Sequence, residues 1–359
     1  MTPADLIRDD IQALRAYHVP DSTGLIKLDA MENPYPWPEA LREDWLASLR
    51  DADLNRYPDP QGRALQAALR EAMGIPADMA LLLGNGSDEL IQMLALAVAA
   101  PGRKVLSLDP GFVMYRMIAL FAGMDYVGVP LRSEDFGLAL EATLTAIARE
   151  EPALTYIAYP NNPTGNLFDA AAIERIIQAS PGLVIVDEAY APFTDQSFIP
   201  RLGEWPNLLV MRTVSKMGLA GLRLGYLAGP PEWLAEIDKV RLPYNVNTLT
   251  QASAAFALRH HAAWDAQTAA IRAERATLFD VLAELDGITP YPSDANFILA
   301  RTGPGRAGAV FQGLLDRGVL IKKLDGAHPL LADCLRITVG TPQENAALLT
   351  ALEAALSTD

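Results

Sequence analysis

The feature that most restricts the fold of this chain is an alternation of short β-rich runs with longer helical patterns between about residues 80 and 228. This alternation is typical of a parallel sheet whose strands are joined by crossover helices. We expect strands at Leu81–Leu83, Val105–Leu108, Tyr126–Val129, Thr155–Ala158, Val184–Val186, Leu208–Met211 and Leu224–Ala228. A helix is expected at Asp88–Ala99, because apolar residues recur there at helical spacing, at Leu90, Ile91, Leu94 and Val98.

The pattern changes after Pro230. A helix-rich stretch, Thr250–Leu285, suits a long connecting helix, and a smaller α+β domain is completed by strands near Asn296–Ala300 and Arg336–Val339 and a final helix, Glu344–Leu356. A chain of 359 residues is long enough for two domains with substantial cores. We therefore expect an α/β protein with an N-terminal arm (1–35) packed on the small domain, a large domain (36–245) and a small C-terminal domain (246–359).

Composition excludes several functional classes. The chain has 29 Lys and Arg against 44 Asp and Glu, a net charge of -15, and no long basic run, which argues against a nucleic-acid or anionic-membrane partner. It has no apolar run of membrane-spanning length and no basic leader, so we expect a soluble, cytoplasmic protein. We expect no disulfide and no metal, because Cys334 is the only cysteine and the four histidines, His18, His260, His261 and His328, lack ligand spacing.

The strongest chemical signal is the run Thr213–Tyr226. In this run Lys216 follows a serine, lies near several glycines and precedes Arg223 by one short loop. The lysine can present an amine to a carbonyl, while the hydroxyl of Ser215 and the guanidinium of Arg223 hold a phosphate. Taken alone, the run also suits a glycine-rich connection with an exposed lysine.

Two other motifs directly follow expected strands. Gly84–Glu89 opens a helix, where free amides favour an anion, but Glu89 stands where a dinucleotide fingerprint needs glycine. Asp187 stands at a strand end, where open α/β sheets bind ligands, and its carboxylate can pair with a pyridine nitrogen and make that ring an electron sink. Tyr190, three residues further on, can donate a hydrogen bond at the same strand end. A tight turn and an acidic helix cap are the simpler interpretations of these motifs.

Two further residues stand out by their surroundings. Asn162 lies in the turn Pro160–Gly165, where the flanking prolines restrict the backbone. Arg336 lies inside an apolar, β-branched run, where a guanidinium needs an anionic partner and its planar fork matches a carboxylate. Ordinary turn chemistry and an internal salt bridge are the respective alternatives. Tyr115 is expected to pack in the core.

In these motifs and their order, from about Leu28 to the C-terminus, the chain resembles fold-type-I pyridoxal-phosphate aminotransferases, and among them the histidinol-phosphate aminotransferase family. The resemblance implies a large domain with a mostly parallel sheet that binds pyridoxal 5′-phosphate, and Lys216 as the lysine that forms the Schiff base. The implied ping-pong reaction converts histidinol phosphate and 2-oxoglutarate to imidazole-acetol phosphate and glutamate in histidine biosynthesis.

The resemblance also assigns the other site residues. With Lys216, the catalytic residues are Asp187 and Tyr190, which also bind the cofactor together with Gly86, Ser87, Asp88, Phe112, Asn162, Ser215 and Arg223. Phe112 stacks on the ring where relatives often carry tyrosine. The residues that the resemblance implies contact the substrate are Tyr17, Asn33, Lys322 and Arg336. Tyr57 reaches the cofactor phosphate of the partner subunit in a homodimer. The loop from Lys216 to Arg223 is one residue shorter than in many relatives, which makes Arg223 the less secure phosphate ligand.

Other functions remain open at this stage. A threonine-phosphate decarboxylase or an aromatic aminotransferase would share these motifs. A cofactor-sensing binding module, like the aminotransferase-like half of certain transcription regulators, would need a basic DNA-binding head, for which the acidic first thirty residues leave no room. A nicotinamide oxidoreductase is disfavoured by Glu89. The expected partners are therefore small amines, keto acids and a second copy of the chain.

Overall fold

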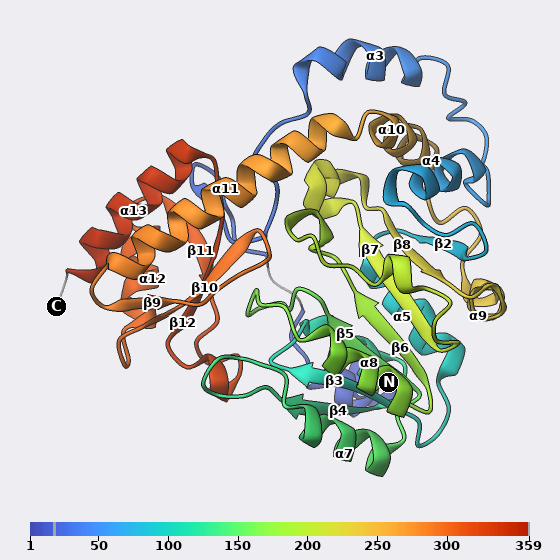
Figure 1. Ribbon diagram of the computed structural model, residues 1–359, viewed down its shortest axis with the longest axis horizontal. Coiled ribbons are helices and arrows are strands. Elements are labelled where there is room, and N and C mark those ends of the chain that lie inside the picture. Colours follow the sequence, from blue (N-terminus) through green and yellow to red (C-terminus); the bar gives the residue numbers. More distant parts are fainter. Residues whose placement is uncertain (17–18, 358–359) are drawn as a thin grey trace.

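The computed structural model describes residues 1–16 and 19–357 and is built around two sheets (Figure 1). The larger, seven-stranded sheet has the order β2-β8-β7-β6-β5-β3-β4. Its strands are β2 (Ala80–Gly84), β3 (Lys104–Asp109), β4 (Asp125–Pro130), β5 (Leu154–Ala158), β6 (Leu183–Asp187), β7 (Leu208–Thr213) and β8 (Gly225–Gly229). Neighbours from β4 to β7 pair in parallel, and β8 runs antiparallel to β2 and β7. The expected mostly parallel sheet is confirmed.

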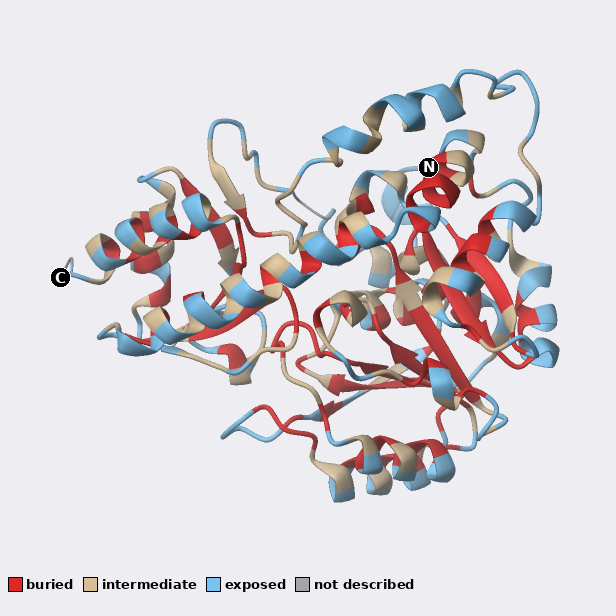
Figure 2. Ribbon diagram, turned by 45° about the horizontal axis from the view of Figure 1, so that its top comes forward, coloured by how far each residue is buried: buried red, intermediate tan, exposed pale blue. Residues whose placement is uncertain are grey.

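Helices cover both faces of this sheet because its central strands are apolar on both faces. In β6, Val184 and Val186 pack in one core with α4 (Arg63–Met73), α7 (Leu140–Glu150), α8 (Ala170–Ala179) and α10 (Thr248–Arg259). Ile185 points the other way, into a second core with α5 (Ser87–Val98), α6 (Val113–Phe121) and α9 (Pro231–Ile237). The buried strands between exposed helix surfaces are visible in Figure 2. This layering leaves the strand ends as the place for a site.

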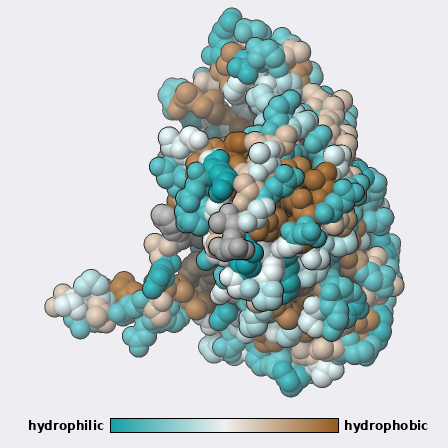
Figure 3. All heavy atoms as spheres, turned by 90° about the vertical axis from the view of Figure 1, so that its left-hand side faces the viewer, coloured by the Kyte–Doolittle hydropathy of each residue, from teal (hydrophilic) through white to brown (hydrophobic). Residues whose placement is uncertain are grey.

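The smaller, five-stranded sheet has the order β1-β11-β12-β10-β9. Its strands are β1 (Ile26–Leu28), β9 (Ile288–Pro290), β10 (Phe297–Thr302), β11 (Val319–Lys323) and β12 (Cys334–Thr338), and its core includes residues of α11 (Ala262–Glu284), α12 (Ala307–Leu315) and α13 (Pro342–Leu356). Cys334 is buried, as expected. Figure 3 views the molecule from this end, where hydrophilic and hydrophobic residues are mixed over the surface. A short helix, α3 (Glu39–Leu49), packs against α10.

Two expectations need correction. The stretch Thr250–Leu285 is two helices, α10 and α11, because α10 ends at Arg259 and the next helix starts only after His261. The N-terminal arm does not pack on the smaller sheet alone. Its β1 pairs with β11, but Arg8, between the short helices α1 (Pro3–Leu6) and α2 (Asp9–Gln12), donates to carbonyls at the end of α6. The boundaries 36–245 and 246–359 stay predictions.

No helix among the described residues is both long and apolar enough to cross a membrane.

Candidate active site

Most of the expected site residues converge on one cavity of about 230 Å³ at the carboxyl ends of β5, β6 and β7. This is the edge at which open α/β sheets bind ligands. The cavity is lined by nine of them: Ser87, Asp88, Phe112, Asn162, Asp187, Tyr190, Ser215, Lys216 and Arg223. Residues 30–32 of the N-terminal segment close one side of it. A cluster predicted from separate motifs is thus brought together by the topology of the sheet.

Lys216 lies in the turn Ser215–Leu219, which directly follows β7. Its Nζ donates to the carbonyl oxygen of Ala30 at 3.2 Å and lies 5.7 Å from the ring centroid of Tyr190. Burial, reinforced by the positive charge of Arg336, lowers the pKa of Lys216 to about 8. About a tenth of this amine is therefore uncharged at pH 7, far more than for an ordinary lysine, and the uncharged form is the one that attacks a carbonyl or accepts a proton.

Asp187 ends β6 and is buried beneath the cavity. Its Oδ2 accepts a hydrogen bond from the Tyr115 hydroxyl at 2.6 Å, and its Oδ1 accepts one from the Ala189 amide at 3.0 Å. Burial raises the pKa of Asp187 to about 6, while these hydrogen bonds oppose that rise. At neutral pH the floor of the cavity carries a carboxylate, the charge that a pyridinium nitrogen requires.

Tyr115 is the site residue that sequence reasoning missed. It is buried as expected, but its hydroxyl reaches Asp187, which is 72 positions away along the chain. The one available signal was its position one helical turn after Phe112, which lines the same cavity.

The other end of the cavity suits a phosphate. Ser87 begins α5, where free backbone amides favour an anion, and Ser215 adds a second hydroxyl. The Arg223 guanidinium lies 3.7 Å from Asp88 and remains half exposed. Gly86 has φ 86°, a backbone conformation that residues with a side chain rarely adopt, and it lies against the guanidinium of Arg223. The short loop after Lys216 therefore still delivers Arg223 to the cavity.

These groups match the chemistry of pyridoxal phosphate. Hydroxyls, helix amides and a guanidinium at one end of the cavity could hold its phosphate, the carboxylate of Asp187 could pair with its ring nitrogen, and Lys216 offers an amine. A buried oxygen of Asp88, Oδ1, has no hydrogen-bond partner in the described chain, which leaves an acceptor available. Among the described residues, no three His, Cys, Asp or Glu side chains are grouped so as to hold a metal ion.

Arg336 lies beside the cavity on β12 and is buried. Its Nη1 donates to Asn162 Oδ1 at 2.6 Å, and its Nη2 donates to the Asp29 carbonyl at 3.1 Å. Lys322 of β11 pairs directly with Arg336 across the antiparallel strands, so both side chains start from the same face of the smaller sheet. Lys322 itself does not line the cavity.

Three expected residues lie elsewhere. The Asn33 amide donates to the Met217 carbonyl at 2.9 Å and to Gln267 Oε1 at 3.0 Å, so it ties the N-terminal segment to the lysine turn and does not face the cavity. Tyr17 lies outside the described residues. Tyr57 is not among the residues that line the cavity: 79% of its surface is exposed, and its ring stacks on Tyr244 with 4.3 Å between ring centroids.

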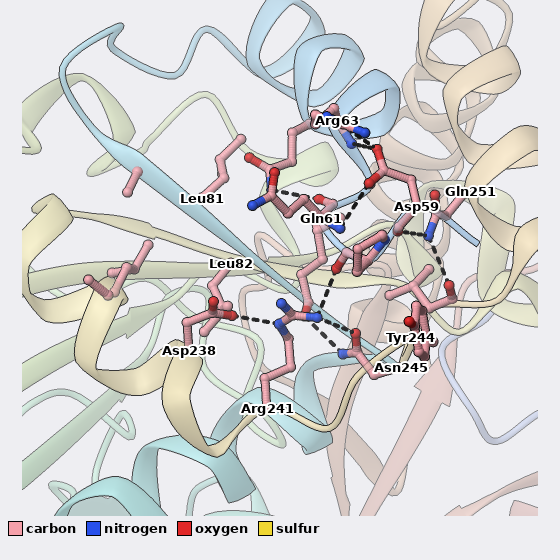
Figure 4. Close-up of a pocket in the computed structure, with 18 of the residues that line it drawn as sticks. Asp59, Gln61, Arg63, Leu81, Leu82, Asp238, Arg241, Tyr244, Asn245 and Gln251 are labelled. Carbon is pink, nitrogen blue, oxygen red and sulfur yellow. Dashed lines mark hydrogen bonds and ion pairs between the residues drawn. The ribbon is translucent and has the colours of Figure 1, made fainter. Parts of the chain in front are cut away.

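The segment that follows Tyr57 is held by polar contacts around a second cavity of about 350 Å³, which Figure 4 shows. Arg241 donates to the Pro60 carbonyl at 2.9 Å, Gln251 donates to the Asp59 carbonyl at 2.9 Å, and Asp59 pairs with Arg63 at 3.0 Å. These hydrogen bonds and this ion pair hold the segment in place. Tyr57 itself remains exposed.

Known proteins resemble this chain over almost its whole length. Residues 23–352 match the family model described as aminotransferase class I and II. The histidinol-phosphate aminotransferase 2 of Cupriavidus pinatubonensis is 58% identical, with 98% of this chain and 96% of that protein covered. The protein of the same description from Nitrosococcus oceani is also 58% identical, with 98% and 97% covered.

A solved structure agrees with this assignment. The histidinol-phosphate aminotransferase of Sinorhizobium meliloti in complex with pyridoxal-5′-phosphate superimposes with a TM-score of 0.87 at 27% identity and covers 98% of each chain. The chain belongs to the class I and II aminotransferases, which use pyridoxal phosphate, and within them to the histidinol-phosphate aminotransferase family.

Proposed function

We propose that this enzyme transfers the amino group of histidinol phosphate to 2-oxoglutarate, which gives imidazole-acetol phosphate and glutamate. The observation that carries the proposal is the meeting of Lys216 and Asp187 in one cavity with phosphate-binding groups at its other end. The two curated relatives at 58% identity are both described as histidinol-phosphate aminotransferases, which supports this donor over an aromatic amino acid.

Each residue has a definite task in this proposal. When bound, pyridoxal phosphate withdraws electrons from the substrate α-carbon and so makes its proton removable. The uncharged amine of Lys216 accepts that proton and returns it on the other side of the transferred nitrogen. The carboxylate of Asp187 keeps the ring nitrogen protonated. Tyr190 and Asn162 hydrogen-bond the 3-oxygen, and Phe112 stacks on the ring.

The phosphate cup and the substrate clamp complete the assignment. Gly86, Ser87, Asp88, Ser215 and Arg223 surround the cofactor phosphate. Arg336 binds the phosphate of histidinol phosphate in the first half-reaction and the carboxylate of 2-oxoglutarate in the second. Asn162, the present partner of Arg336, holds the guanidinium in place until an anion arrives.

The experiment that tests the proposal is a half-reaction screen. Holoenzyme is mixed with one amine at a time, and conversion of the bound cofactor is followed by its absorbance. Histidinol phosphate should react fastest. Faster conversion by phenylalanine would favour an aromatic aminotransferase, and release of carbon dioxide from threonine phosphate would favour a decarboxylase.

Lys322 is proposed to bind the phosphate of the substrate together with Arg336. Because Lys322 is only partly buried, its truncation to alanine should weaken binding of histidinol phosphate by about 2 kcal/mol, or roughly thirty-fold, and should affect glutamate less. Arg336→Ala should weaken both substrates. The dissociation constants come from titrations of the half-reaction.

Lys323→Ala is the matched control, because Lys323 is the next residue of β11 and starts from the opposite face of the sheet. It should leave both dissociation constants unchanged. Equal, small effects of Lys322→Ala on both substrates would contradict the assignment.

We also infer that the working unit is a homodimer in which Tyr57 completes the site of the partner subunit. An exposed tyrosine on an anchored loop, with the exposed apolar residues Leu54 and Leu242 nearby, supports this inference. A cytoplasmic location fits this role and stays a prediction.

Subunit mixing tests this arrangement. Tyr57→Ala and Lys216→Ala homodimers should each be impaired, yet a mixture should regain activity at about one quarter of the sites. Random exchange makes half of the dimers mixed, and each mixed dimer has one intact site.

The control is a Tyr57→Ala/Lys216→Ala double variant mixed with wild type, which should lose activity because its mixed dimers contain no intact site. Absence of recovery after mass spectrometry has demonstrated exchange would show that Tyr57 does not act across the interface.

A further inference from the structure

Both oxygens of the Asp187 carboxylate are already bound by the protein. Tyr115 donates its hydroxyl to Oδ2 at 2.6 Å, and the Ala189 amide donates to Oδ1 at 3.0 Å. The amide belongs to the turn after β6 and comes with the backbone. Tyr115 comes from α6, a separate element, so its hydroxyl is the one side-chain contact that can be removed while the strand stays intact.

The ring of Tyr115 is fixed by its aromatic neighbours. It stacks on Tyr156 of β5 with 4.5 Å between ring centroids and 10° between planes, and it meets Phe112 edge-on at 5.5 Å. Only 1% of Tyr115 is exposed. A ring held on two sides keeps its hydroxyl aimed at Asp187 before any ligand binds.

Tyr156 supplies an internal comparison. It is equally buried and shares the same stack, but its hydroxyl has no hydrogen-bond partner in the described part of the chain. The two tyrosines thus differ in the single bond to Asp187. Loss of a hydroxyl from either one should disturb packing equally.

The charges around Asp187 oppose its ionisation. Burial raises the pKa of this carboxyl, and the nearby carboxylates of Asp88 and Glu188 raise it further. Against these, the Tyr115 hydroxyl is the largest contribution that favours the charged form, followed by the Ala189 amide. Tyr156 and Tyr190 face the same carboxylate, but burial raises the pKa of both, so they stay neutral.

We propose that Tyr115 is a positioning residue for the reaction: its hydroxyl holds Asp187 charged and oriented to meet the ring nitrogen of the cofactor. The proposal rests on the role given to Asp187 above. The hydrogen bond from Tyr115 favours the ionised form of Asp187 before the cofactor binds, although the buried and acidic surroundings favour its protonation.

The first test uses apoenzyme, so it does not depend on turnover. The free energy of unfolding by urea is measured against pH for wild type, Tyr115→Phe and Tyr156→Phe, each with and without Asp187→Asn to isolate this carboxyl. Because the folded pKa of Asp187 lies above its ordinary value of 3.8, stability falls as pH rises from that value to about 6 and then levels off.

Removal of a hydrogen bond to a charged group should lower the acid dissociation constant of Asp187 about ten- to hundred-fold in Tyr115→Phe. The loss of stability should then continue above pH 6, whereas Tyr156→Phe should level off with the wild type.

The second test uses holoenzyme. In Tyr115→Phe, kcat should fall about ten- to hundred-fold toward acidic pH and recover toward alkaline pH, with little change in KM for histidinol phosphate. The pH dependence of the absorbance of the bound cofactor should be displaced from that of the wild-type holoenzyme in the same direction as the kcat profile. Tyr156→Phe should keep the wild-type pH profile.

The outcomes separate this proposal from the one that it rests on. Levelling of the Tyr115→Phe stability curve at the wild-type pH would overturn the proposal, as would an unchanged kcat profile despite a shifted stability curve. Near wild-type turnover of Asp187→Asn would instead refute the role of Asp187, and the apoenzyme curves would still report whether Tyr115 governs its charge.

Discussion

Lys216→Ala should lower the rate of the half-reaction with histidinol phosphate on the order of 10⁴-fold, the upper end of what a positioned general base contributes. The lysine amine is the group in the cavity whose pKa of about 8 lets it both attack a carbonyl and accept a proton near neutrality. The loss is measured in single turnovers by the absorbance of the bound cofactor. Added small amines should restore part of the rate, because they supply the missing base.

Lys104→Ala is the matched control. The Lys104 amine pairs with Glu150 at 2.6 Å, away from the cavity, so its removal should leave the half-reaction unchanged. Borohydride reduction of wild-type holoenzyme should attach the cofactor to Lys216, as mapped by mass spectrometry. An adduct on Lys27, Lys104 or Lys239 would mean that the anchoring lysine has been wrongly assigned.

Asp187→Asn should reduce kcat by about 10² to 10³-fold, the effect expected when one partner of a buried charge pair is lost. Asparagine keeps the shape and one acceptor oxygen but cannot hold a proton on the ring nitrogen. The phosphate cup lies at the other end of the cavity and is untouched, so cofactor affinity should fall far less than turnover.

The measurement for Asp187→Asn is exchange of the substrate α-proton with solvent, alongside an equilibrium titration of apoenzyme with pyridoxal phosphate. Asp88→Asn serves as the comparison for both measurements, because it removes a carboxylate from the phosphate end of the same cavity and not from the end where Asp187 lies. Near wild-type proton exchange in Asp187→Asn would exclude the proposed role. Loss of cofactor binding with normal exchange per bound cofactor would place Asp187 among the binding residues only.

The larger sheet was predictable because each of its strands carries an apolar signal of its own. All seven expected strands overlap observed ones, with ends displaced by at most two residues. In the smaller sheet, β1, β9 and β11 were not among the expected strands. The strands β1 and β9 have three residues each, which are too few to display a period. The break at His260 and His261 was also hidden, since neither residue is a strong helix breaker.

The site was predictable to the extent that its motifs are local. Motifs at strand ends must meet at one edge of the sheet, so the meeting of Lys216 and Asp187 follows from topology. The bond from Tyr115 to Asp187 has no such local signal, because it depends on the packing of α6 against β5 and β6. The position of Asn33 against the lysine turn, where a substrate contact was expected, likewise depends on tertiary packing.

The pairing of β1 with β11 has a consequence for how the chain is made. Ile26 leaves the ribosome 293 residues (319 minus 26) before its partner Val319. Every strand of the larger sheet emerges in between, up to Gly229. The nascent chain can therefore complete the larger sheet while β1 still waits for a neighbour. Residues 30–32 follow β1 and line the cavity, so this side of the active site depends on a strand that is made after the whole larger sheet.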